Sequence, residues 1–129
     1  MGNGTQLGAV RGLGSSKHGA EHWIVQRTTA IANFALMLWL IVSIIRLPDY
    51  DHETLFNWLR SPLAGVPMAL LILSVVTHMK SGLQVFIEDY VHDEGLKFAS
   101  LTALTFATYG LGATAFFALG RIVFMGAAS

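Results

Sequence analysis

Three long apolar runs, over residues 30–45, 66–87 and 98–119, constrain this chain more than any other feature. The first and third runs carry no charged residue, and a few polar residues interrupt the second. An α-helix rises about 1.5 Å per residue, so roughly 20 residues cross a bilayer core about 30 Å thick. The second and third runs have this length, and the first reaches it if its helix begins near Trp23 or Ile24.

Only helices and closed barrels satisfy the backbone inside lipid, and the period-2 alternation of barrel strands is absent. The sequence therefore predicts an all-α membrane protein with three transmembrane helices; the alternative is a very apolar soluble helical bundle. The predicted helices cover about residues 24–46, 64–89 and 97–124. We expect residues 1–21 to form a polar, glycine-rich N-terminal tail and residues 22–129 to form the transmembrane domain.

The composition excludes several other classes of protein. Charged residues make up only 12% of the chain, about half the usual share of a soluble domain. Eight basic residues balance eight acidic ones, so the basic excess of a nucleic-acid-binding protein is missing. There is no cysteine, which excludes a disulfide scaffold, a cysteine nucleophile, an all-cysteine iron–sulfur site in this chain and covalently attached haem.

Three crossings place the two termini on opposite sides of the membrane. Basic residues flanking the spans number four on the N-terminal side and three on the other, namely Arg11, Lys17, Arg27 and Lys97 against Arg46, Arg60 and Arg121. By the positive-inside rule this difference predicts a cytoplasmic N-terminus. Between the first two spans, residues 53–59 are expected to form a short interfacial helix, with Trp58 at the membrane boundary.

His78 lies in the middle of the second span, where an ionisable residue marks function by default. Gly82 follows one turn later on the same side and would let a flat ligand approach the helix. Neutral imidazole binds iron well, but the residues alone favour a packed or proton-handling histidine over a haem or metal ligand. The remaining histidines are expected in tails or loops: His18, His22, His52 and His92. A haem with two histidine ligands would therefore need its second ligand from another chain.

Other polar residues near the spans have two interpretations each. Lys80 lies about 200° around the helix from His78, where it either snorkels to the aqueous edge or pairs with an anion. Tyr90 is either an aromatic-belt anchor or a donor to a quinone carbonyl, with Asp89 beside it. Arg27 either flanks the first span or contacts an anion.

The third span carries small residues at spacings of four, three and four: Ala103, Ala107, Gly110 and Thr114. Such a stripe lets another helix approach closely, so we expect helix packing on this face.

Two segments carry a resemblance to a known family. The run from His78 to His92, HMKSGLQVFIEDYVH, resembles the second-helix signature of the small hydrophobic membrane anchor of succinate dehydrogenase, the succinate:quinone oxidoreductase of complex II. Residues 22–31, HWIVQRTTAI, resemble the lead into the first helix of that family. The length and the three-span layout also fit, so the resemblance extends over nearly the whole chain.

The resemblance implies a non-catalytic polypeptide that shares a helical bundle with a second membrane anchor of the cytochrome b556 type. This bundle would hold a flavoprotein and an iron–sulfur subunit on the cytoplasmic face of a bacterial membrane, with the turn between helices 2 and 3 on that side. Haem b would lie between the anchors with His78 as one axial ligand, and Arg27, assisted by His22, near a propionate. Tyr90 would hydrogen-bond ubiquinone, with Asp89 as its neighbour.

Three rival functions remain open on the sequence, and the simplest of them is a structural anchor without haem. A fumarate reductase anchor shares the architecture and runs the reaction in reverse. A small proton-conducting protein would use His78, Lys80 and Asp89 as a relay, without haem.

Overall fold

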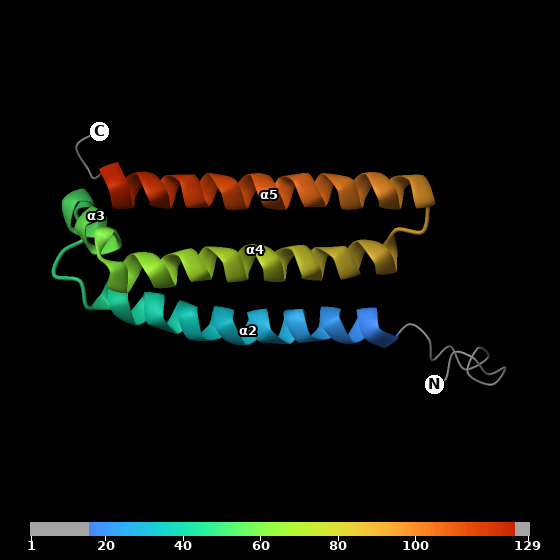
Figure 1. Ribbon diagram of the computed structural model, residues 1–129, viewed down its shortest axis with the longest axis horizontal. Coiled ribbons are helices and arrows are strands. Elements are labelled where there is room, and N and C mark those ends of the chain that lie inside the picture. The colour runs from blue at the N-terminus through green and yellow to red at the C-terminus, as the bar shows by residue number, and fades with distance from the viewer. Residues whose placement is uncertain (1–15, 126–129) are drawn as a thin grey trace.

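A computed structural model describes residues 16–125, with side chains from residue 19 onward, and consists there of four helices. They are α2 (Ser16–Ile45), α3 (His52–Arg60), α4 (Pro62–Tyr90) and α5 (Glu94–Met125). The three long helices run antiparallel in one layer, and α4 lies between α2 and α5 (Figure 1). The beginning of α2, the end of α4 and the beginning of α5 therefore share one end of the bundle, while α3 covers the other end (Figure 1).

The prediction of an all-α protein with three spans is confirmed. Three helices are long and apolar enough to cross a membrane: Gly19–Ile45, Pro62–Tyr90 and Glu94–Met125. This is a multi-pass membrane protein. The short helix expected over 53–59 is also present, as α3.

The helices are longer than predicted, most of all at the start of α2. This helix begins at Ser16, inside the segment expected to be a tail, while residues 1–15 lie outside the described residues. The polarity of a segment places it outside the bilayer core but does not end a helix, and no proline interrupts residues 16–23. The connection between the second and third spans, which the predicted helix ends leave at residues 90–96, likewise shortens to residues 91–93.

Side-chain caps and one proline set the boundaries of the shorter elements. The Asp51 carboxylate accepts a hydrogen bond from the Thr54 backbone N–H at 2.9 Å and starts α3. Hydrogen bonds from the Thr54 side chain and backbone lower the pKa of Asp51 below its ordinary value. Pro62 opens α4, where its fixed φ suits a first turn. Asp93 accepts from the Leu96 N–H at 2.7 Å and starts α5.

The packing of α4 against α5 uses small and apolar residues. On α5, Leu119 is buried, and Thr108 is only 1% exposed. The Thr108 hydroxyl donates to the Leu104 carbonyl at 2.8 Å, so its burial leaves no unpaired donor. A Cβ added to Gly112 would lie 3.6 Å from a methyl group of Val76, which shows how closely the two helices approach.

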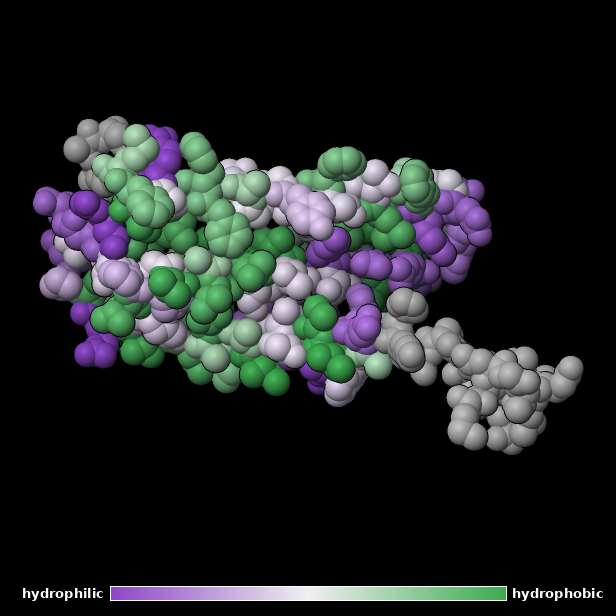
Figure 2. All heavy atoms as spheres, viewed as in Figure 1, coloured by the Kyte–Doolittle hydropathy of each residue, from purple (hydrophilic) through white to green (hydrophobic). Residues whose placement is uncertain are grey.

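Most large apolar side chains lie on the outside of the three-helix layer. Apolar residues cover its flanks, and hydrophilic residues gather mainly at the two ends (Figure 2). Phe34, Phe106 and Leu63 are 70%, 75% and 85% exposed, respectively. An apolar outer surface of this extent requires lipid or another protein chain to cover it.

The small-residue stripe of α5 does not pack against α4. Its four members are all exposed, namely Ala103, Ala107, Gly110 and Thr114. A Cβ added to Gly110 would meet nothing within 4 Å. Within the described part of the chain the stripe therefore lies open on the outer face of α5, and Gly112 takes the packing role.

Candidate functional site

The imidazole of His78 lies at the contact between α4 and α2. Its Nδ1 is 3.0 Å from the hydroxyl oxygen of Thr29, and both side chains are part-buried. His78 is 12 residues before the end of α4 at Tyr90, which is about 18 Å of helix. The predicted position of His78 deep within a span is thus confirmed, and its partner is a residue of the first helix.

Thr29 makes further hydrogen bonds that fix it in place. Its hydroxyl donates to the Val25 carbonyl at 2.7 Å, one turn earlier in α2. Its own carbonyl accepts from the Ser74 hydroxyl at 3.2 Å. Because Ser74 and His78 are one turn apart on the same face of α4, that helix contacts Thr29 at two successive turns.

Thr29 belongs to a polar face of α2 that the sequence interpretation missed. The face consists of four part-buried residues at spacings of four, three and four: His22, Gln26, Thr29 and Asn33. His22 Nε2, Gln26 Oε1 and Asn33 Oδ1 are buried without a hydrogen-bond partner among the described residues. Each such atom costs about 1–3 kcal/mol, so the face suits a polar group supplied from outside this chain. The sequence signal that could have revealed this face is the helical spacing of its polar residues along an apolar segment.

His18 and His22 lie inside α2 and His52 begins α3, so their expected places in tails or loops are wrong. His22 is seven residues from Thr29, which is about 10 Å along the helix toward the end that carries Tyr90. His52 stacks on Phe56 at the start of α3, with ring centroids 3.9 Å apart, and His92 lies in the 91–93 turn. The side chain of His18 lies outside the described residues. No second histidine among the described side chains is level with His78.

Gly82 faces α2. A Cβ added there would lie 3.6 Å from the amide nitrogen of Gln26. The side chain of Gln26 therefore borders the space beside Gly82.

Arg27 lies apart from His78. Its guanidinium carbon is 5.5 Å from the centroid of the Trp23 ring, a cation–π contact, and its side chain is exposed. Arg27 is two residues before Thr29, about 200° around α2, so it projects from another side of the helix.

Asp89 and Tyr90 form the exposed end of α4. The Tyr90 side chain is 70% exposed, and its ring centroid is 4.7 Å from that of Phe86. The end of α4 lies beside the beginning of α2 (Figure 1). The predicted site residues therefore spread from the middle of the bundle to one end of it.

Lys80 lies on the other side of α4 from His78, as its position in the helix predicts. Its Nζ is 4.9 Å from the centroid of the Tyr109 ring on α5. Both residues line a cavity of about 480 Å³ between α4 and α5, together with Ser81 and Gln84. The described residues include no group of three or more His, Cys, Asp or Glu side chains that could hold a metal ion.

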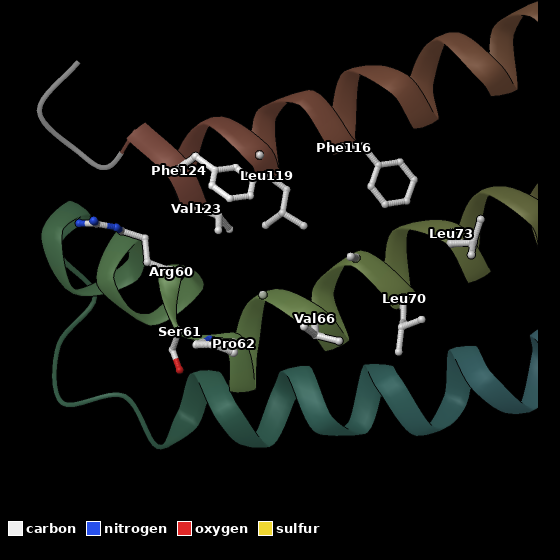
Figure 3. A pocket seen from close by; sticks show the side chains of 13 residues that line it. Arg60, Ser61, Pro62, Val66, Leu70, Leu73, Phe116, Leu119, Val123 and Phe124 are labelled. Atoms are coloured by element: carbon white, nitrogen blue, oxygen red, sulfur yellow. The ribbon is translucent and has the colours of Figure 1, made fainter.

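A larger cavity, of about 570 Å³, also lies between α4 and α5 (Figure 3). It lies beside the end of α3, at the end of the bundle away from Tyr90. Its walls are mainly apolar, with Val66, Leu70 and Phe116 along the helices and Arg60 at one edge. None of the residues singled out from the sequence as a ligand or quinone contact lines it.

The fold and site define a three-span membrane protein with one histidine held between two of its helices. Residues 1–112 match the family described as the succinate dehydrogenase/fumarate reductase transmembrane subunit. The chain belongs to this family, and the resemblance found in its motifs is confirmed.

Individual relatives agree with this assignment. The succinate dehydrogenase hydrophobic membrane anchor subunit of Rickettsia bellii is 32% identical over 82 residues, 64% of this chain and 66% of the relative. The succinate dehydrogenase membrane anchor subunit of Reclinomonas americana is 30% identical over 89 residues, 67% of this chain and 74% of the relative. The hydrophobic membrane anchor subunit of Paracoccus denitrificans is 25% identical over 114 residues, 88% of each chain. The chain thus spans slightly less than two thirds of the Rickettsia relative.

Proposed function

We propose that this chain is a membrane-anchor subunit of succinate dehydrogenase. It holds the flavoprotein and iron–sulfur subunits on the membrane, supplies His78 as one axial ligand to a haem b shared with a second anchor subunit, and helps form the ubiquinone-reduction site. The observation that carries the proposal is a mid-span histidine with one ring nitrogen engaged, in a chain of this family.

The residues around His78 fit a haem. Neutral imidazole binds haem iron through one ring nitrogen, and Thr29 engages the other. When bound, haem b supplies a one-electron redox centre. No other described histidine is level with His78, so the second ligand comes from the partner anchor and the haem lies at the subunit interface.

Two residues of α2 are the candidates for contact with the haem propionates. The Nε2 of His22 is buried without a hydrogen-bond partner among the described residues, and a propionate would supply that partner. Arg27 carries the opposite charge to a propionate, but its guanidinium rests on Trp23. Its role therefore requires the side chain to leave that ring.

Tyr90 and Asp89 are the quinone contacts of the proposal. The Tyr90 hydroxyl donates a hydrogen bond to a quinone carbonyl, and the Asp89 carboxylate takes part in proton delivery to the same oxygen. Both side chains are exposed at the end of α4, where the soluble subunits would cover them. In this proposal the turn at 91–93 and the N-terminus lie on the cytoplasmic side of a bacterial inner membrane.

Two observations favour this function over its rivals. The relatives described above are named as succinate dehydrogenase anchors, although the family also includes fumarate reductase subunits. A relay through His78 and Lys80 is disfavoured because His78 contacts α2 while Lys80 lies over Tyr109 of α5.

The direct test is purification of the chain from its native membrane in mild detergent, followed by a subunit gel and a reduced-minus-oxidised spectrum. We expect two larger soluble subunits, a second small membrane subunit and a b-type haem band. Isolation of the chain alone, without any haem band, would contradict the proposal.

A further inference from the structure

We infer that Thr29 is a positioning residue that fixes the tautomer and the ring orientation of His78. The inference rests on the proposed function, because it concerns how the ligand is prepared for iron. The geometry that carries it is the set of hydrogen bonds around one hydroxyl oxygen.

The Thr29 hydroxyl has a single proton, and three acceptor positions compete for it. Its oxygen lies 2.7 Å from the Val25 carbonyl oxygen, 3.2 Å from the Gln26 carbonyl oxygen and 3.0 Å from His78 Nδ1. Two oxygens 2.7 Å apart without a proton between them repel each other, so the proton belongs to the bond with Val25. The hydroxyl can then only accept from His78, which requires Nδ1 to carry the imidazole proton.

A neutral imidazole protonated at Nδ1 has its lone pair at Nε2. Nε2 is therefore the atom available to iron, and the bond to Thr29 sets the plane of the ring. Donation from Nδ1–H also raises the basicity of the imidazole, which favours ferric over ferrous haem and lowers the reduction potential.

Ser74 holds Thr29 in the position that this requires. Its hydroxyl donates to the Thr29 carbonyl at 3.2 Å, and Ser74 itself is only 7% exposed. The backbone of Thr29 is thereby tied to α4 one turn before His78. The hydroxyl and the imidazole are held by the same pair of helices.

The test compares Thr29→Val, which keeps the shape of the side chain and removes the hydroxyl, with Thr29→Ser, which keeps the hydroxyl. Both are made in the whole complex, and the readouts are haem content per complex and the haem midpoint potential from a potentiometric titration. We expect Thr29→Val to bind haem roughly tenfold to a hundredfold more weakly, with a raised potential in the haem that remains. Thr29→Ser should match the wild type in both readouts.

Ser74→Ala is the control for packing, since it removes one tie between Thr29 and α4 but keeps both partners of the imidazole bond. It should change the potential less than Thr29→Val. If Thr29→Val does not assemble, Thr29→Ala replaces it in the comparison with Thr29→Ser. Wild-type haem content and potential in Thr29→Val, or equal changes in the serine and valine variants, would overturn the inference. Haem retained in full after His78→Ala would instead overturn the proposed ligand.

Discussion

The two contacts of α4 differ in chemistry. Against α2 it presents Ser74 and His78, and both bond to Thr29. Against α5 it packs closely at Gly112, Thr108 bonds only within its own helix, and Lys80 lies over the ring of Tyr109. The first contact contains three buried polar atoms without partners in the described chain, and all three belong to α2.

This difference indicates that the α2–α4 contact serves binding and the α4–α5 contact serves stability. Unpaired buried polar atoms destabilise a membrane protein unless another group forms hydrogen bonds with them. We therefore expect them where a ligand or a partner chain supplies those hydrogen bonds. The α4–α5 contact needs no such partner and stabilises the fold by packing. Substitutions at the two contacts should therefore affect different measurements.

The largest effect on stability is expected at the α4–α5 contact. Gly112→Leu inserts a side chain where even a Cβ would lie 3.6 Å from Val76, and it should destabilise the chain by about 1–3 kcal/mol. Gly110→Leu is the matched control, because the space beside Gly110 is open. Thermal unfolding of the two variants in the same detergent measures the difference. Equal loss of stability in both would remove the distinction between the two faces of α5.

The next effect concerns the exposed end of α4. Tyr90→Phe removes one hydroxyl donor and should slow quinone reduction roughly fivefold, since one hydrogen bond contributes about 1 kcal/mol. Succinate oxidation with a soluble artificial acceptor should be unchanged. Tyr50→Phe, also at an exposed tyrosine but at the opposite end, should leave both rates alone. Equal slowing of both reactions in Tyr90→Phe would contradict a role at the quinone.

A smaller effect separates Lys80 from His78. Lys80→Met removes the cation–π contact with Tyr109 and should cost about 0.5–1 kcal/mol of stability. The haem spectrum should not change, because Lys80 faces α5. Tyr109→Phe keeps an aromatic face and should retain most of the contact. A shifted haem band in Lys80→Met would show that the two sides of α4 are not independent.

The smallest effect is confined to α3. The pKa of Asp51 is lowered in the folded chain, so its cap is present above the ordinary value of 3.8 and is lost as the pH falls through the lowered value. After correction for the intrinsic rate, amide exchange at Thr54 should therefore accelerate at low pH. Asp51→Ala should abolish this dependence, and Asp49→Ala should preserve it. A pH profile unaffected by Asp51→Ala would rule out the cap as its cause.

The sequence predicted the parts of this molecule that depend on local composition. The three spans follow from long apolar runs, and the depth of His78 follows from its position within the second run. The helix ends did not, because polar residues at 16–23 continue a helix as readily as they form a tail. Thr29 was missed since its partner lies 49 residues away, and their meeting depends on how the two helices are rotated and aligned. The stripe on α5 has packing-like spacing but lies on the open face.

The most direct test of the central claim is the haem content of the purified complex after His78→Ala, compared with His52→Ala. His52 is an exposed histidine that stacks on Phe56 in α3, away from the α2–α4 contact. We predict that His78→Ala loses the b-type haem band, or retains only a weakly bound remnant, and that His52→Ala keeps it in full. An unchanged spectrum and haem stoichiometry in an assembled His78→Ala complex would contradict the account.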